Sequence, residues 1–432
     1  MMSAVTAAGY DRSGPANAGR GRPWDRVPPI AWVVACIALW GAVAFFPVPG
    51  NDLDQFFWPS ARIAVAGQPL MVYQPAGQQS YPNANGPLAL APLTVAGIVV
   101  KALGWTDSMQ LRRLVALSLF SLFILLMARE AVMAVERLRG QRLSGRARFF
   151  TYAAFAVAPP IWHSVAGYGH IEQPLEIWLV LLAARWAAAE RPLRGGATLG
   201  LAILARSSAT LLALPLLLAG SRQGIRRAGG VAIVGAVVAI GGLLPFFLAD
   251  RVDVAHSLFG YRSSLLVGSG SIWTFSRGTA WEQVAQHWDL AMVDALVVAI
   301  NLWLATRPGG MVRGRIYAAL ALTAASFALL AKTVWPYYFL EVYVFSAIWA
   351  LGRARASKAA LISPLVVVSA LGLFAEVGSA PNQSESLVHL EAGVMFGLLG
   401  AAMLIALAVA SGGLLDEPDA PPDLSSSGRH LS

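Results

Sequence analysis

Two acidic residues, Asp52 and Asp54, stand two positions apart just after the first long apolar run of the sequence. The aromatic stretch 56–58 follows them directly. Carboxylates beside apolar groups at a membrane surface are candidates for a raised pKa and for proton abstraction as a general base. The same pattern also fits a solvated loop whose aromatic side chains form a belt at the membrane interface.

A second polar group lies between two apolar runs, in the segment 167–174. It contains His170 and Glu172, and ionisable residues at or near membrane depth are functional candidates by default. We predict that His170 contacts a phosphate group of the substrate and that Glu172 takes part in substrate binding. The alternative is structural, with the segment capping a helix and Glu172 satisfied by neighbouring groups.

Arg206 lies in the middle of the apolar run 197–219, next to two serines. A charge at the centre of a bilayer costs about 3 kcal/mol or more unless it faces a polar cavity. An anionic ligand such as a phosphate group is one reason to keep the arginine there. The other is an internal salt bridge, for which Glu172 and Glu176 are the candidate partners.

Lys332 is one of only three lysines in the chain, and the helix-breaking Pro336 follows it closely. An ammonium group is a compact charge that suits a phosphate, whereas the alternative is a lysine that extends to the membrane interface. We therefore predict a donor-phosphate site made by Arg206, Lys332 and His170. The residues that we expect to bind other parts of the substrate are Glu172, Tyr81, Tyr338, Arg62 and Trp335.

The composition limits the kind of protein in which these side chains act. Hydrophobic residues make up 57% of the 432 residues and charged residues only 13%, and the mean hydropathy is +0.60. Such a sequence is typical of a chain that crosses a membrane several times. The single cysteine, Cys36, excludes a disulfide framework and a cysteine-based zinc site. Sequence patterns for dinucleotide binding, zinc proteases and EF-hands are absent.

We expect no cofactor and no metal. A divalent cation held by the acid pair is the one alternative, and we do not expect it because no third carboxylate lies nearby in the sequence.

Apolar runs follow one another along the chain and predict an all-α polytopic bundle of about 10–12 transmembrane helices. The runs are 29–47, 87–104, 110–128, 149–167, 173–189, 197–219, 229–249, 289–306, 315–331, 335–351, 360–377 and 391–411. The membrane domain is therefore expected over residues 28–411. The flanking segments 1–27 and 412–432 are expected to be disordered tails.

The distribution of basic residues orients the bundle, because arginine-rich segments stay on the cytoplasmic side. This rule accounts for the net charge of +9 without a nucleic-acid partner and places both tails in the cytoplasm. To keep the segment 129–148 inside, the run 87–104 must be re-entrant or lie along the surface. The run 197–219 must likewise be a broken helix or a short hairpin. The outward segments are then 48–86, 168–172, 250–288, 332–338 and 378–390.

An outward carboxylate with converging cations is the set of groups that transfer of a sugar from a lipid phosphate requires. With these groups in place, the sequence resembles GT-C-type polytopic glycosyltransferases over about residues 28–352, and glycosyltransferase family 87 most closely. The segments that carry the resemblance are Asp52-Leu53-Asp54-Gln55-Phe56, Gly67 to Tyr73, Tyr81 to Leu88, and the Gly-x-Gly-His-x-Glu junction at 167–172.

The resemblance implies an inverting transfer of a monosaccharide, such as mannose or arabinofuranose, from a polyprenyl-phosphate donor to a glycolipid or glycan of the cell envelope. It makes Asp52 the first candidate for the general base and Asp54 the second. It also implies an outward-facing GT-C cavity at a bacterial plasma membrane. Two other functions stay open: a polytopic transporter or flippase, which would share the membrane arginine and the broken helix, and a non-catalytic membrane subunit.

Overall fold

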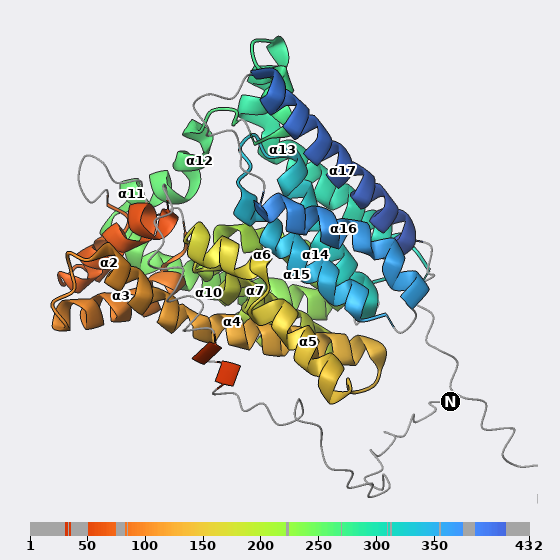
Figure 1. Cartoon of the computed structure of the whole chain (residues 1–432), viewed down its shortest axis with the longest axis horizontal. Coiled ribbons are helices and arrows are strands. Elements are labelled where there is room, and N and C mark those ends of the chain that lie inside the picture. The colour runs from red at the N-terminus through yellow and green to blue at the C-terminus, as the bar shows by residue number, and fades with distance from the viewer. Residues whose placement is uncertain are drawn as a thin grey trace, which may run out of the picture.

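The computed structural model describes residues 31–32, 34–35, 51–74, 83, 85–221, 224–268, 270–308, 310–311, 313–353, 356–374 and 385–411. Within these residues every regular element is a helix or a short helical turn (η), and none is a β-strand (Figure 1). The tails 1–27 and 412–432, most of the run 29–47 and the greater part of the segment 378–390 lie outside the described residues.

The first elements in chain order are η2 (Leu53–Phe57), α2 (Trp58–Val65), η3 (Pro69–Met71), α3 (Pro87–Ala102), α4 (Met109–Arg139), α5 (Gly145–Ala156), α6 (Pro159–Trp162), η4 (His163–Gly167), α7 (Gln173–Ala188), α8 (Pro192–Ala205), η5 (Ser207–Thr210) and α9 (Ala213–Ser221). They are followed by α10 (Ile225–Ala249), α11 (Arg251–Ala255), η6 (His256–Gly260), α12 (Tyr261–Ser264), η7 (Ile272–Ser276), α13 (Ala280–Thr306), α14 (Arg313–Leu330), η8 (Pro336–Tyr338), α15 (Phe339–Leu351), α16 (Ala356–Phe374) and α17 (Glu385–Ser411).

Four helices among the described residues, α4, α10, α13 and α17, are long and apolar enough to cross a membrane. This agrees with the α-helical membrane protein that the composition predicts. Several other apolar helices are shorter. Helix α3, for example, has 16 residues and a length of about 24 Å. Because the hydrocarbon core of a bilayer is about 30 Å thick, α3 is short for a full crossing.

The most completely buried part of the bundle is the pair of helices α14 and α15. Large side chains such as Phe345 and Trp349 have no exposed surface. Helix α15 packs against α14, α16 and α4, and α14 packs against α13 and α17, so the pair is enclosed by helices on several sides (Figure 1). Helix α7, which carries part of the candidate site, packs against α4 and α8. The elements that position the site are therefore among the most firmly held.

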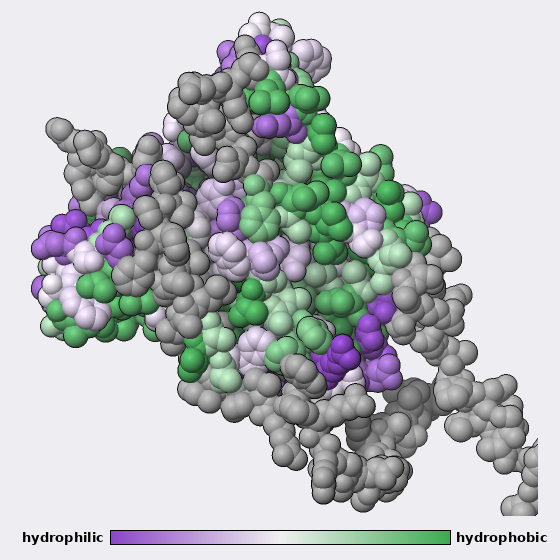
Figure 2. Space-filling view, viewed as in Figure 1, coloured by the Kyte–Doolittle hydropathy of each residue, from purple (hydrophilic) through white to green (hydrophobic). Residues whose placement is uncertain are grey.

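The outer helices carry apolar faces that the described chain does not cover. On α10 the exposed apolar side chains recur at intervals of three and four residues, at Ile233, Val237, Ile240, Leu244 and Leu248. Such a stripe lies on one face of a helix. Figure 2 shows a similar apolar surface over the helices at the right of the view, α13, α16 and α17. These faces fit contact with lipid tails.

Some helices extend further than the apolar runs predicted. Helix α4 continues to Arg139, so the first half of the basic segment 129–148 is helical. No glycine or proline interrupts it before Gly140, whose φ of +67° ends the helix.

The segment 250–288, predicted as a long outward loop, contains α11, η6, α12 and η7. Helix α13 already begins at Ala280, where the hydroxyl of Thr279 accepts a hydrogen bond from the N–H of Trp281 at 3.2 Å. The run 149–167, predicted as one span, is divided at Pro159 into α5, α6 and η4.

Helices α8 and α10 approach each other closely at two glycines of α8. A Cβ at Gly200 would lie 2.6 Å from the carbonyl oxygen of Gly235 and 2.7 Å from Cβ of Val238, and Gly196 faces α10 in the same way. Small residues at four-residue spacing allow helix backbones to come together in membranes. The contact fixes α8, whose last residue immediately precedes Arg206.

We expect Gly200→Ala to lower the apparent melting temperature of the detergent-solubilised protein, because the added Cβ forces α8 and α10 apart. Gly241→Ala, in the same helix pair, is the matched control, since a Cβ at Gly241 meets no atom within 4 Å. Alanine is favoured over glycine in a helix by up to about 1 kcal/mol. The control is therefore expected to be neutral or slightly stabilising, and equal effects of the two substitutions would contradict the close approach.

Candidate active site

Asp52, His170 and Glu172 form one continuous line of hydrogen-bonded groups. The Nε2 atom of His170 lies 2.7 Å from Oδ2 of Asp52, and its Nδ1 atom lies 2.7 Å from Oε1 of Glu172. The Asp52 side chain keeps 18% of its surface exposed, whereas that of Glu172 is fully buried. The line therefore leads from the protein surface into the interior of the bundle.

Backbone contacts hold the two segments of this line together, although they lie more than a hundred residues apart in the chain. The N–H of Asp52 donates to the carbonyl oxygen of Tyr168 at 2.8 Å, and the side-chain amide of Asn51 donates to that of Gly167 at 3.0 Å. Gly169 has a φ of +83°, and a Cβ there would overlap the Asn51 amide. Glycine at 169 therefore satisfies both the conformation and the space available.

The position of His170 between two carboxylates determines its protonation. A neutral imidazole has only one N–H donor, so it cannot donate to Asp52 and Glu172 at the same time. With both carboxylates ionised, His170 is the imidazolium. Burial opposes this charge, but Glu172 and Asp52 outweigh that effect and raise the pKa of His170 above its ordinary value. Both ring nitrogens are engaged, so neither is left for the donor phosphate that we predicted as its ligand.

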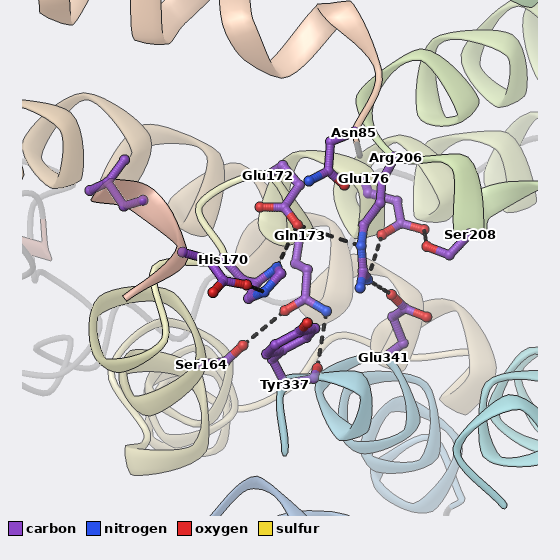
Figure 3. A network of polar contacts seen from close by, with 12 residues as sticks. Asn85, Ser164, His170, Glu172, Gln173, Glu176, Arg206, Ser208, Tyr337 and Glu341 are labelled. Carbon is purple, nitrogen blue, oxygen red and sulfur yellow. Dashed lines mark hydrogen bonds and ion pairs between the residues drawn. The ribbon is translucent and has the colours of Figure 1, made fainter. Parts of the chain in front are cut away.

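Aromatic and amide side chains make further contacts that hold the segments around His170 in place. The ring of Tyr337 lies against that of His170, with centroids 3.3 Å apart. The side-chain amide of Gln173 donates to the carbonyl oxygen of Tyr337 at 3.0 Å and accepts from the hydroxyl of Ser164 at 2.8 Å. These contacts tie η8 to η4 and to the start of α7 (Figure 3).

Arg206 stands at the inner end of the line and is surrounded by carboxylates (Figure 3). Its Nε atom lies 3.5 Å from Glu172, and its Nη1 atom lies 3.4 Å from Glu176 and also pairs with Glu341. Only 6% of the arginine side chain is exposed. Of the two alternatives that the sequence left open for Arg206, the structure contains the internal salt bridge, and it joins α7, α15 and the segment between α8 and η5.

The predicted break in the run 197–219 is confirmed at Arg206. Helix α8 ends at Ala205, Arg206 is extended with φ −154° and ψ 130°, and η5 begins at Ser207. The hydroxyl of Ser208 in η5 donates to Glu176 at 3.1 Å. The break thus places both Arg206 and Ser208 beside the same carboxylate.

Asp54 lies in a different environment from Asp52. Its Oδ2 atom accepts a hydrogen bond from Nε of Arg113 at 2.6 Å, and its Oδ1 atom lies 3.8 Å from Arg112. The pair of arginines at the start of α4 therefore compensates its charge. This arrangement ties η2 to α4, and it makes Asp52 the better placed of the two acids for proton transfer.

Lys332 belongs to a second polar cluster, at the ends of α12, α13 and α14. Its ammonium group donates to the carbonyl oxygens of Ser263 and Gln286, both at 3.0 Å. Its main-chain N–H donates to Asp289 at 2.9 Å. Because an ammonium group has three donors, one N–H of Lys332 is left by these contacts.

Arg262 connects this cluster to the aromatic residues of the site. Its Nη2 atom lies 3.7 Å from Asp289, and its Nη1 atom lies 3.4 Å from the hydroxyl of Tyr338. The rings of Tyr338 and Tyr337 have centroids 4.7 Å apart. Tyr338 therefore lies next to Tyr337, which contacts His170. Lys332 is connected to Tyr338 through Asp289 and Arg262.

The remaining predicted residues are placed as follows. Trp335 is 41% exposed and lies just before η8. Arg62 lies on α2 and lines a groove between α2, the end of α3 and the start of α4. Tyr81 lies outside the described residues.

Several residues that complete the site were not selected from the sequence. Glu341 and Tyr337 lie in an aromatic-rich stretch that reads as an interfacial belt, and Asn51 and Gln173 are neutral amides with no motif. Of these residues, Glu341 is the one that the sequence could have indicated, because an acid inside an apolar run requires a partner. Arg262 was one of many charged residues in the segment 250–288, and only the folded chain distinguishes it.

No group of three or more histidine, cysteine, aspartate or glutamate side chains in the described part of the chain is arranged to hold a metal ion. No protein-family model matches the sequence, and comparison with curated proteins gives no match. The site is therefore interpreted from its own geometry.

The raised pKa of His170 predicts how stability depends on pH. A raised pKa in the folded state stabilises the protein below the unfolded pKa of about 6.5. That stabilisation is lost as the pH rises through the folded pKa. We expect the apparent melting temperature of the wild type to fall from pH 6.5 upward more steeply than that of His170→Gln. The exposed His287 gives the control His287→Gln, whose profile should follow the wild type. Parallel profiles for all three proteins would show that His170 is not the imidazolium.

Removal of Arg206 tests its structural role. Arg206→Gln leaves Glu172, Glu176 and Glu341 without their cation, and breaking such a buried pair costs about 3–5 kcal/mol. We expect a large fall in the apparent melting temperature, in contrast to Arg142→Gln at an exposed position. An Arg206→Gln protein as stable as the wild type that no longer binds its substrate would instead assign the arginine to a ligand.

Proposed function

We propose that this protein is a GT-C-type membrane glycosyltransferase that moves a monosaccharide from a polyprenyl-phosphate donor to a glycolipid or glycan on the outer face of a bacterial plasma membrane. The observation that carries this proposal is the placement of Asp52. It is a partly exposed carboxylate whose Oδ2 atom is hydrogen-bonded to His170. The buried Glu172 binds the other ring nitrogen of the histidine and so fixes its orientation. Such a carboxylate is oriented as a general base should be.

In the proposed reaction, Oδ1 of Asp52 accepts the proton of an acceptor hydroxyl. The hydroxyl oxygen forms a bond to the anomeric carbon while the bond from that carbon to the phosphate oxygen breaks. Inversion at the carbon follows from this single displacement, and polyprenyl phosphate leaves with the bonding electron pair. His170 acts as a positioning residue, because it holds Oδ2 and leaves Oδ1 without a partner among the described residues.

The leaving phosphate needs cations that are not already neutralised. Glu172, Glu176 and Glu341 already surround Arg206 and compensate its charge, which leaves it poorly suited to an incoming phosphate. Arg262 is better suited, because it pairs with one carboxylate, Asp289, at 3.7 Å rather than with three, 22% of its side chain is exposed, and its Nη1 lies beside Tyr338. Lys332, with its remaining N–H, is the second candidate. We therefore assign donor phosphate to Arg262 and Lys332, and sugar contacts to Tyr338 and Trp335.

One observation favours a second function, that of a transporter. Buried rows of acidic, histidine and arginine side chains, together with broken helices, also occur in proton-coupled transporters. The line from Asp52 through His170, Glu172 and Arg206 to Glu341 has this form. A transporter would require the row but not a general base.

The test supplies purified protein with radiolabelled polyprenyl-phosphate-mannose or polyprenyl-phosphate-arabinose and a lipid extract as acceptor. We expect Asp52→Asn to reduce transfer by roughly 10²–10⁴-fold, the usual contribution of a general base, with donor binding largely retained. Glu391→Gln removes an exposed carboxylate elsewhere and should leave transfer unchanged. Intact donors in the presence of a folded wild-type protein would count against a transferase that uses either sugar and would favour the transporter.

A further inference from the structure

A groove of about 390 Å³ lies between α2, the end of α3 and the start of α4. Its lining combines apolar and charged side chains. The apolar part consists of Trp58, Ala61, Val65, Ala66, Gly97 and Val100. The polar part consists of Arg62, Lys101, Thr106, Asp107 and Arg112.

The charge of this groove is positive. Three basic side chains, Arg62, Lys101 and Arg112, line it together with a single carboxylate, Asp107. Asp54 lies close to Arg112, but its stronger partner is Arg113, at 2.6 Å against 3.8 Å. The groove therefore retains an excess of positive charge that no described acidic residue cancels.

Arg112 has hydrogen-bonding capacity that the protein does not use. One of its amino groups donates to the carbonyl oxygen of Thr106 at 2.7 Å, and its guanidinium lies 5.7 Å from the ring centroid of Trp58. Its Nε atom is buried and has no hydrogen-bond partner among the described residues. Unsatisfied buried donors are rare in native proteins. Because 19% of the Arg112 side chain is exposed, an acceptor in the groove can reach the guanidinium group.

The position of α3 indicates where such an acceptor comes from. The helix exposes Val95, Ile98 and Val99, and Leu103 directly after it is exposed as well. These residues flank the groove residues Gly97 and Val100. An apolar helix that ends in a lysine fits contact with lipid tails, with the ammonium group of Lys101 extending toward the headgroups. The left-hand end of the molecule in Figure 2, where α2 and α3 lie in Figure 1, shows polar and apolar side chains together. The groove thus opens beside a surface suited to lipid.

We propose that this groove binds the phosphate group of a membrane lipid, with the phosphate on Arg62, Lys101 and Arg112 and the first part of the lipid tail on the apolar lining. The groove is separate from the donor-phosphate site assigned to Arg262 and Lys332. The proposal concerns binding only and does not depend on glycosyl transfer.

The test measures lipid binding to delipidated full-length protein in a phosphate-free detergent by native mass spectrometry. The probes are a polyprenyl phosphate, phosphatidylglycerol, the corresponding polyprenol without phosphate, and inorganic phosphate. Each basic side chain near a lipid phosphate contributes about fivefold in affinity. We therefore expect Arg62→Gln combined with Lys101→Gln to weaken lipid-phosphate binding by about 25-fold.

The matched control is Arg142→Gln combined with Arg226→Gln, which removes the same charge at two exposed positions and should bind like the wild type. A second variant, Ala66→Trp, fills the groove without changing its charge and should also weaken binding. A preference for polyprenyl phosphate or for phosphatidylglycerol identifies the lipid. Equal binding by the groove and control variants would overturn the proposal, and so would inorganic phosphate or the polyprenol binding as well as the lipid phosphates.

Discussion

The cost of placing charged groups inside an apolar bundle is the constraint on which this structure depends. An unpaired buried charge costs several kcal/mol, and the described bundle contains Glu172, Glu176 and Arg206 with almost no exposed surface. Each group is therefore paired, and the pairs join elements that are distant in the chain. Glu341 on α15 and Glu172 before α7 share the guanidinium that follows α8. The packing of these elements is set by the distances that the ion pairs require.

The same constraint explains where regular helix geometry is interrupted. Residues Leu53–Phe57 and His163–Gly167 form π turns, and both lie next to members of the polar line, Asp52 and His170. Such turns often occur at functional positions, because they redirect side chains at a cost in helix stability. The extended conformation of Arg206 is a third interruption. These three deviations lie at or near members of the same row of charges, whereas a further π turn, η6 (His256–Gly260), contains no member of it.

Helix positions followed from the apolar runs, because burial in a bundle or in lipid requires continuous apolar sequence. The break at Arg206 was also predictable, since a charge and two serines within an apolar run are incompatible with a plain span. The pairing of His170 with Asp52 was not predictable, because 118 residues separate them and only tertiary packing brings them together. The roles of Glu341 and Lys332 depend on neighbouring elements in the same way. The sequence did indicate Glu172 and Glu176 as candidate partners of Arg206, and both pairs are present, whereas partners on distant elements, such as Asp52 for His170, depend on the folded chain.

The segment from Asp52 to Arg62 joins the proposed general base to the groove for which we propose lipid binding. It is helical almost throughout, as η2 and α2, and its middle is anchored to α4 by the pair of Asp54 and Arg113. Ten residues of helix cover about 15 Å, but the groove also contains Arg112, which lies 3.8 Å from Asp54. The groove therefore extends back along this segment toward Asp52. A lipid held there would lie beside the segment that carries Asp52, so movement of η2 and α2 would affect both sites together.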